Sequence, residues 1–222
     1  MKNNHLFNII FIDEPVPYKE SLLEQEKLAI ARLENRISDT ILFLEHHAVI
    51  TRGVRAKDEN LLCSKEVLAT KGIMLEDTPR GGDVTYHGPG QLVVYPIIKL
   101  SKPKADIRGY INKLEEVAIK TVGKYNIDAF RRTGMTGVWT ESGKIAAIGV
   151  RVKRWVVFHG MSLNVAPDLS HYDNIVPCGL NGEKVTSLSK LLNTSIEVKQ
   201  VRSTMADCFA EVFDRKTAIQ IK

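Results

Sequence analysis

The sequence lacks the features that mark several specialised classes of protein. No apolar run approaches the roughly 18 residues that a membrane-spanning helix requires. The three cysteines, Cys63, Cys178 and Cys208, form an odd and widely spaced set, which argues against a disulfide framework. No Cys-x-x-Cys pair is present for zinc, and the adjacent His46 and His47 would point to opposite faces of a strand. We therefore expect no metal site.

The sequence also has little net charge and no dense block of either sign. Lysine and arginine total 31 against 26 acidic residues, which gives a net charge of +5 and a pI of about 9.0. This excess could attract an acidic partner, but its even spread argues against nucleic acid. The short apolar run at the N-terminus is interrupted by Asn8 and ends at Asp13 and Glu14. It indicates a buried strand rather than a signal peptide, so we expect a cytoplasmic protein that does not bind membranes.

The 222 residues, 44% hydrophobic and 26% charged, suffice for one sizeable core, and we expect a single domain over residues 1–222. Apolar periodicity predicts helices and strands. The predicted helices span 18–34, 64–71, 105–122 and 197–213. Strands are predicted over 6–12, within 40–51 with a break near His46, over 91–100, and in a meander from 137 to 165 with a tight turn at Ser142-Gly143. The hairpin-connected middle strands favour an α+β fold with a mixed sheet over a doubly wound nucleotide fold.

The densest cluster of polar and glycine residues runs from Pro79 to Gln91, with the sequence PRGGDVTYHGPGQ. Glycine lets a backbone approach a ligand closely. The spacing fits neither a phosphate loop nor a dinucleotide loop. A plain glycine-rich hairpin is the alternative. The polar and aromatic side chains among the glycines favour a binding loop.

The three cysteines differ in their local settings. Cys178 lies between Pro177 and Gly179, which predicts a turn. Cys208 falls on the apolar stripe of the last predicted helix, and Cys63 follows two leucines, so burial is expected for both. A free thiol has a pKa near ~8.5 and needs help to become a nucleophile at neutral pH. Cys178 is the candidate nucleophile, although a turn cysteine alone does not establish that role.

Two further residues could belong to a site. Lys144 opens an apolar strand directly after a turn. It could extend to solvent at the strand end, or it could point into a site, where its ammonium would stabilise a nearby thiolate and later move protons. His159, in FHGMSLNV, could be a hydrogen-bonded core histidine or could line a pocket together with His87.

Taken together and in order, these segments resemble the lipoyl(octanoyl) transferase family. RGGDVTYHGPGQ followed by YPI is similar to the family's most characteristic motif, and GVWT, GKIAAIGVRV, FHGMSLNV, PCGL and VTSL follow at familiar spacings. HHAVITRG resembles the family's upstream loop, where Ala48 and Arg52 depart from the common pattern. The resemblance covers roughly residues 15–192. It implies a fold related to lipoate–protein and biotin–protein ligases.

The resemblance also implies a reaction that needs no cofactor. Octanoyl would pass from octanoyl-acyl carrier protein to a lysine of lipoyl domains, those of the 2-oxoacid dehydrogenase complexes and of the glycine cleavage H protein. Cys178 would form the acyl-thioester intermediate, and Lys144 would lower its pKa. The matching substrate-binding positions are Arg80, Gly81, Gly82, Asp83, Val84, Thr85, Tyr86, His87, Ala147, Ile148, Gly149, Gly160, Met161 and Ser162.

Two other functions remain open at this point. A lipoate–protein ligase of related fold would consume ATP. The corresponding loop of such enzymes is similar to Gly-Gly-Gly, whereas this chain has Asp83 after two glycines. The other is a non-catalytic module that binds acyl carrier protein.

For the transferase, backbone N–H groups near Gly179 or near Gly149 are both candidate oxyanion donors. For octanoyl transfer, Cys178 and Lys144 should be near neighbours across a pocket that the loop from Arg80 to His87 closes.

Overall fold

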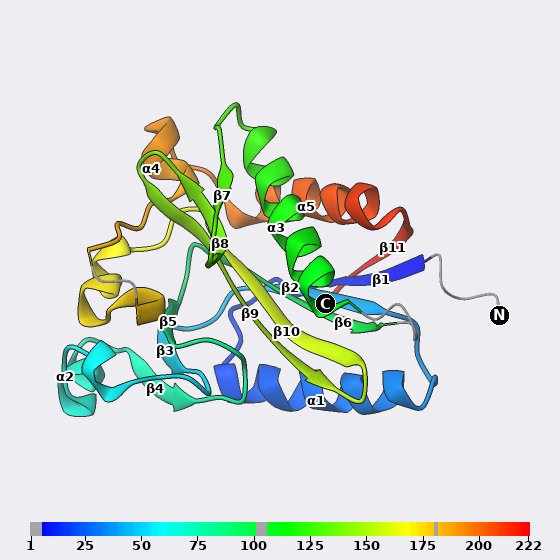
Figure 1. Ribbon diagram of the computed structural model, residues 1–222, viewed down its shortest axis with the longest axis horizontal. Helices are drawn as coiled ribbons and strands as arrows, with labels where there is room; N and C mark the ends of the chain where they lie inside the picture. Colours follow the sequence, from blue (N-terminus) through cyan, green and yellow to red (C-terminus); the bar gives the residue numbers. More distant parts are fainter. Residues whose placement is uncertain (1–5, 101–105, 180–181) are drawn as a thin grey trace.

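The computed structural model describes residues 6–100, 106–179 and 182–222. Its centre is an eight-stranded sheet in the order β11-β1-β2-β6-β10-β9-β8-β7 (Figure 1). β1 is parallel to both of its neighbours, and the other pairs are antiparallel, which confirms the predicted mixed sheet. The strands are β1 (Leu6–Phe11), β2 (Thr40–Leu44), β6 (Gln91–Lys99), β7 (Phe130–Arg132), β8 (Met135–Thr140), β9 (Gly143–Lys153), β10 (Val156–Asn164) and β11 (Lys216–Ile221).

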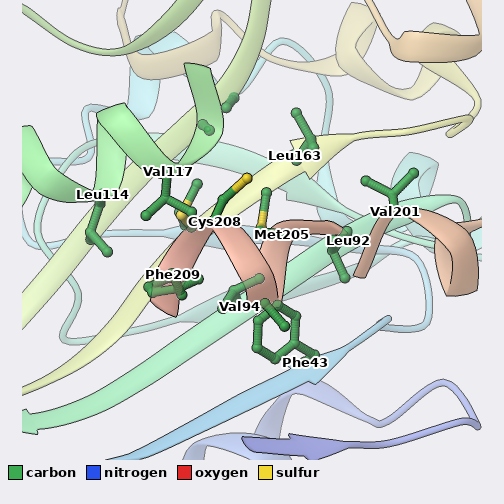
Figure 2. Close-up of a cluster of buried hydrophobic side chains, with 14 of the residues drawn as sticks. Phe43, Leu92, Val94, Leu114, Val117, Leu163, Val201, Met205, Cys208 and Phe209 are labelled. Atoms are coloured by element: carbon green, nitrogen blue, oxygen red, sulfur yellow. The ribbon is translucent and has the colours of Figure 1, made fainter. Parts of the chain in front are cut away.

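Helices cover both faces of this sheet. α1 (Tyr18–Leu33) packs on one face against β6 and β10, and α3 (Ile107–Gly123) packs with α5 (Val198–Phe213) on the other (Figure 1). The largest apolar cluster lies between the sheet and the α3–α5 pair. Figure 2 shows Cys208 within it, beside Met205 and Phe209. Cys208 is therefore a core residue, as its place on the helical stripe predicted.

A second, three-stranded sheet lies beside the first in the order β4-β3-β5. Its strands are β3 (Val49–Arg52), β4 (Met74–Asp77) and β5 (Val84–His87), and α2 (Lys65–Thr70) packs against β4. A separate small core lies under it. Three 3-10 turns (Asp58–Asn60, Leu169–Asn174 and Pro177–Gly179) and the short α4 (Leu188–Leu192) complete the elements in the described ranges. None of the helices described is both long and apolar enough to cross a membrane.

Most of the predicted elements are confirmed, with small shifts. The four predicted helices are present, although residue 105, where the third was expected to start, lies outside the described residues. The segment 40–51 forms two strands that belong to different sheets. Between them, His46 is buried and His47 exposed, as opposite faces require. The predicted turn at Ser142-Gly143 is shifted by one residue, because Gly143 already pairs with Thr140 across the β8–β9 turn.

The pairing between β6 and β10 lapses at one point, and α1 compensates for it. Met161 lies opposite Val94, so Pro96 falls opposite His159. Proline has no N–H to donate to a ladder. His159 adopts a positive φ of 55°, and its amide donates instead to the side-chain Oε1 of Gln25 at 3.0 Å. This explains why the apolar stripe of α1 contains one buried glutamine.

Replacing Gln25 with leucine is expected to destabilise the protein by about 1–3 kcal/mol, because the buried His159 N–H loses its acceptor. For a chain of this size, each kcal/mol corresponds to a shift of about 2–4 °C in Tm. Differential scanning calorimetry measures that shift. The same substitution at the exposed Gln200 of α5 is the matched control and should leave Tm nearly unchanged. An unchanged Tm for Gln25→Leu would show that this hydrogen bond contributes nothing.

Candidate active site

A cavity of about 660 Å³ lies against β5, β9 and β10 and the loops that flank them. This volume falls within the range of ~300–1,000 Å³ that is usual for small-molecule sites. The segments predicted from the sequence converge on it. The lining residues are Tyr18, Arg55, Lys57, Glu59, Asn60, Arg80, Gly82, Asp83, Thr85, His87, Tyr95, Gly134, Met135, Thr136, Lys144, Ala147, Ile148, Gly149, His159, Gly160, Met161, Ser162 and Gly179.

The glycine-rich loop is fixed across β9 by close backbone contacts. The amide of Gly81 donates to the carbonyl of Val150 at 3.0 Å. A Cβ on Gly149 would lie 2.6 Å from the carbonyl oxygen of Gly81, so only glycine fits there. The buried guanidinium of Arg80 donates to the carbonyl of Thr51 at 2.6 Å and to its hydroxyl. Arg80 thereby ties the loop to β3 as well.

The residues after the loop alternate between two environments, as successive residues of a strand must. Thr85 and His87 line the cavity. Val84 and Tyr86 point away from it into the small core, where Tyr86 donates to or accepts from His171 Nδ1 at 2.8 Å. Of the predicted lining positions, Val84, Tyr86 and Gly81 are thus not brought to the cavity wall.

Asp83 forms several hydrogen bonds directly before β5 begins. Its carboxylate accepts hydrogen bonds from the backbone amides of Lys57 and Val84 and from the side-chain amide of Asn60. A Cβ on Gly179 would lie 2.8 Å from Asp83 Oδ2. The Asp83 carboxylate, which these hydrogen bonds hold in place, therefore packs against the turn that contains Gly179.

The predicted nucleophile, Cys178, lies in the 3-10 turn Pro177–Gly179, which confirms that this segment is a turn. The segment is anchored on both sides. Before it, the amide of Val176 donates to the carbonyl of Asn60 at 2.8 Å. After it, Lys184 accepts from the backbone amide of Lys144 at 2.8 Å, and Thr186 donates to the carbonyl of Lys144 at 2.9 Å. Lys144 and Gly179 line the same cavity.

Lys144 does not extend to solvent, because its relative exposure is 5%. Its strand position places it directly opposite Trp139 on β8. The ammonium Nζ lies 5.0 Å from the centroid of the Trp139 ring and donates to the carbonyl of Thr136 at 3.3 Å. A Cβ on Gly137 would lie 2.7 Å from Lys144 Cε. The lysine thus runs along β8 into the cavity rather than away from the protein.

Burial keeps the histidines around the cavity neutral. His46 donates from Nδ1 to the carbonyl of Val16, so its Nε2 accepts from the hydroxyl of Tyr95. Desolvation lowers the pKa of His46 to about 4 and that of His87 to about 3, with the neighbouring His46 lowering the latter further. His87 donates from Nδ1 to Gln91 at 2.7 Å. Neither histidine carries charge at neutral pH.

His159 lines the cavity, as one of the two alternatives for it predicted. Its relative exposure is 1%, and neither ring nitrogen has a hydrogen-bond partner among the described residues. Desolvation, assisted by the charges of Arg80 and Arg151, lowers the pKa of His159 to about 3. The alternative of a hydrogen-bonded core histidine is therefore wrong for its ring, although its backbone amide is bonded to Gln25.

Several lining residues were not predicted from the sequence. Tyr18 and Tyr95 had been assigned only to an apolar helix stripe and an apolar strand, and Asn60 and Thr136 lie outside the motifs. The hydroxyl groups of the two tyrosines could have indicated these positions, because a buried tyrosine hydroxyl usually has a hydrogen-bond partner. Tyr18 bonds to the hydroxyl of Thr78 at 2.8 Å, and Tyr95 bonds to His46.

Comparison with known proteins shows the family of the chain. Residues 17–210 match the model of the lipoyl protein ligase A/B catalytic domain, which is most of the chain. The chain belongs to this family. It is 44% identical over 211 residues to an octanoyltransferase of Caldicellulosiruptor saccharolyticus, covering 94% of this chain and 89% of that protein. It is 46% identical over 199 residues to an octanoyltransferase of Solibacter usitatus, covering 90% of each. The family member described here is thus an enzyme, an acyltransferase.

Solved structures of the family and of its neighbours share the fold. Lipoate-protein ligase A bound with ATP matches with a TM-score of 0.80 at 17% identity, covering 97% of this chain and 88% of that one. Biotin protein ligase from Aquifex aeolicus matches with a TM-score of 0.54 at 13% identity, covering 93% and 69%. The expected relation to lipoate and biotin ligases is confirmed at the level of the fold.

Proposed function

We propose that this enzyme acts in the cytoplasm and transfers an octanoyl group from octanoyl-acyl carrier protein to a lysine of lipoyl domains. The proposed acceptors are the lipoyl domains of the 2-oxoacid dehydrogenase complexes and the glycine cleavage H protein. Cys178 carries the acyl group as a thioester, and Lys144 stabilises the Cys178 thiolate. The whole chain acts as one catalytic domain and requires neither ATP nor a metal. The octanoyltransferase names of relatives above 40% identity support the acyl group.

One observation carries the proposal. A buried lysine and the turn that contains a cysteine border the same cavity, joined by hydrogen bonds between Lys144 and the segment that follows the turn. A buried ammonium near a thiol favours the thiolate, because it stabilises the charged form. Lys144 is buried rather than extended to solvent, and Cys178 lies on a turn.

The cavity wall suits an acyl chain and an acidic donor. Ala147, Gly149 and Gly160 contribute little or no side chain, and the low pKa values of His87 and His159 keep those rings uncharged at neutral pH. Uncharged groups on this part of the wall let an alkyl chain leave water without leaving a charge desolvated. The exposed cations Arg55 and Lys57 line the cavity on its solvent side, where they suit an acidic carrier protein.

In the first half-reaction, the Cys178 thiolate attacks the thioester carbonyl of the donor. The tetrahedral oxyanion forms within reach of backbone N–H groups, with those near Gly179 and Gly149 as candidates. The bond from carbon to the carrier sulfur breaks, and the Lys144 ammonium gives the carrier thiolate its proton. One thioester replaces another at nearly equal energy, so alignment is the main task of the protein.

In the second half-reaction, the neutral amine of the acceptor lysine attacks the acyl group on Cys178. The bond from carbon to the Cys178 sulfur breaks, and the nitrogen loses one proton to the neutral Lys144 amine. The thiolate and the ammonium are restored together. Exchange of a thioester for an amide drives the reaction forward, and double-displacement kinetics follow from the covalent intermediate.

The ATP-dependent ligase remains the alternative, because a ligase bound with ATP has the same fold. Two features favour the transferase. The glycine-rich loop has Asp83 after Gly81 and Gly82, where the loop of such ligases is similar to Gly-Gly-Gly. The sequence also contains a turn cysteine, which adenylate chemistry does not need. The third possibility, a non-catalytic carrier-binding module, would leave the buried Lys144 without a role.

Intact-mass spectrometry with octanoyl-acyl carrier protein tests the proposal. Without ATP, the wild-type enzyme should gain one octanoyl group that is released by hydroxylamine, as expected for a thioester. Adding an apo-lipoyl domain should discharge the enzyme and yield an octanoylated lysine. The matched arm supplies free octanoate with ATP, and no modification is expected there. Modification in that arm alone, with no acyl-enzyme, would establish the ligase instead.

A further inference from the structure

The side chain of Lys144 lies against three residues of β8, Thr136, Gly137 and Trp139. Its ammonium lies over the ring of Trp139, it donates to the carbonyl of Thr136, and its side chain passes within contact of Gly137. Trp139 has the largest side chain of these contacting residues, and its relative exposure is 0%. The 5.0 Å separation of Nζ from the ring centroid is within the ~6 Å reach of a cation–π interaction.

The geometry of β8 and β9 creates this contact. The two strands pair Thr140 with Gly143 and Trp139 with Lys144, and the register then shifts between Trp139 and Val138. Such an irregularity re-aims side chains next to active sites. It is held in place from α3, because the Gly137 amide, in a backbone with φ of 136°, donates to the buried carboxylate of Glu115 at 3.0 Å.

Trp139 has a feature that packing alone does not account for. Its indole Nε1 is buried and lacks a hydrogen-bond partner among the described residues. An unsatisfied buried N–H destabilises a fold, and phenylalanine at this position would avoid it. Tryptophan, however, offers the strongest aromatic face for a cation. A second cation, Arg132, also lies over the ring at 5.6 Å, and it is itself paired with Glu183 at 2.7 Å.

We propose that Trp139 is a positioning residue that holds the Lys144 ammonium at the cavity wall, beside the turn of Cys178. This inference rests on the proposed function, because it assigns Trp139 a role through Lys144. Among the described residues, charged groups near this pair include Arg132 from β7, which lies over the Trp139 ring, and Glu183, which is bonded to Arg132. Glu115 from α3 accepts from the amide of the neighbouring Gly137. Without the ring, the ammonium would move among other contacts and stabilise the thiolate less.

The test measures the pH dependence of Cys178 alkylation by iodoacetamide together with single-turnover acylation. Trp139→Leu should raise the alkylation midpoint by about one pH unit towards that of a free thiol and, because one unit is a factor of ten in thiolate, slow acylation by up to about tenfold at neutral pH. Trp139→Phe, which keeps an aromatic face, should fall between Trp139→Leu and wild type. Trp155→Leu, the same change in the turn between β9 and β10, is the matched control and should leave the midpoint unmoved.

A double-mutant cycle separates the two proposals. If Trp139 acts through Lys144, then Trp139→Leu should add no further shift in a Lys144→Met background. Equal shifts in both backgrounds would overturn the positioning role. If Lys144→Met itself leaves the midpoint unmoved, the role of Lys144 in the proposed function fails instead.

A second measurement covers the case in which Trp139→Leu does not fold. Fluorinated tryptophans, incorporated in a Trp155→Phe background, weaken the π face of Trp139 progressively while nearly keeping its shape. The alkylation midpoint should rise stepwise from mono- to trifluorinated ring at an unchanged Tm. A midpoint that does not change with fluorination would overturn the positioning role.

Discussion

Replacing Cys178 with serine is expected to abolish octanoyl transfer and the acyl-enzyme adduct together. A serine hydroxyl is far less ionised than a thiol at neutral pH, so the buried Lys144 ammonium has no nucleophilic anion to stabilise. Loss of a covalent nucleophile costs on the order of 10³-fold or more in kcat. Single-turnover assays with octanoyl-acyl carrier protein and intact-mass spectrometry measure the two effects.

The other two cysteines provide the controls for this prediction. Cys63 is half-buried beside Asn174, and Cys208 is packed in the main core. Cys63→Ser and Cys208→Ala should both retain the adduct and near-normal transfer, although the second should lower Tm. Near-normal turnover by Cys178→Ser would contradict the covalent scheme, whatever the controls show.

Acidification from pH 6.5 to 5 is expected to destabilise the protein steeply because of three buried histidines. His46, His87 and His159 have pKa values of about 4, 3 and 3 in the folded state, against about 6.5 in an unfolded chain. Between these values the unfolded chain binds more protons, so the free energy of unfolding falls as the pH falls. Each histidine contributes up to about 1.4 kcal/mol per pH unit in this window.

Guanidinium unfolding at several pH values measures this slope. His159→Asn should reduce it by up to a third, since asparagine tolerates the positive φ at this position and does not titrate. The exposed His47 gives the control, because His47→Gln should leave the slope as it is. Asp13 titrates below this window, because hydrogen bonds from Arg202 and Lys199 lower the pKa of its carboxyl group. A flat response between pH 6.5 and 5 would mean that the three rings are hydrated or charged in the folded protein.

The elements with strong apolar periodicity were predictable from the sequence. α1, α3 and α5 each carry a stripe, and β6 is a continuous apolar run, so local pattern alone located them. β11 was not predicted, because its residues are mostly exposed and carry little pattern. Its position depends on distant partners. It pairs with β1, and Arg215 just before it bonds to the buried Asp39.

The candidate site was predictable as a set of segments but not as a geometry. The sequence marked Cys178 and Lys144 separately, 34 positions apart. The cavity that Lys144 shares with Gly179, the neighbour of Cys178, is framed by hydrogen bonds between β9 and residues 184–186, which no local pattern encodes. The glycine-rich segment was expected to act as one binding loop. Strand alternation in β5 divides it, with Thr85 and His87 on the cavity side and Tyr86 in the small core.

The lapse in pairing at His159 has a consequence for how the cavity responds to its contents. β10 is held along its length by β9, but β6 holds it only in two separate stretches on either side of Pro96. The cavity reaches this point, since Tyr95 and Gly160 both line it. The central sheet therefore has fewer strand-to-strand hydrogen bonds where the acyl chain is proposed to lie. Longer acyl chains are expected to be accommodated by a small bend of the sheet rather than by rearrangement at the cavity mouth.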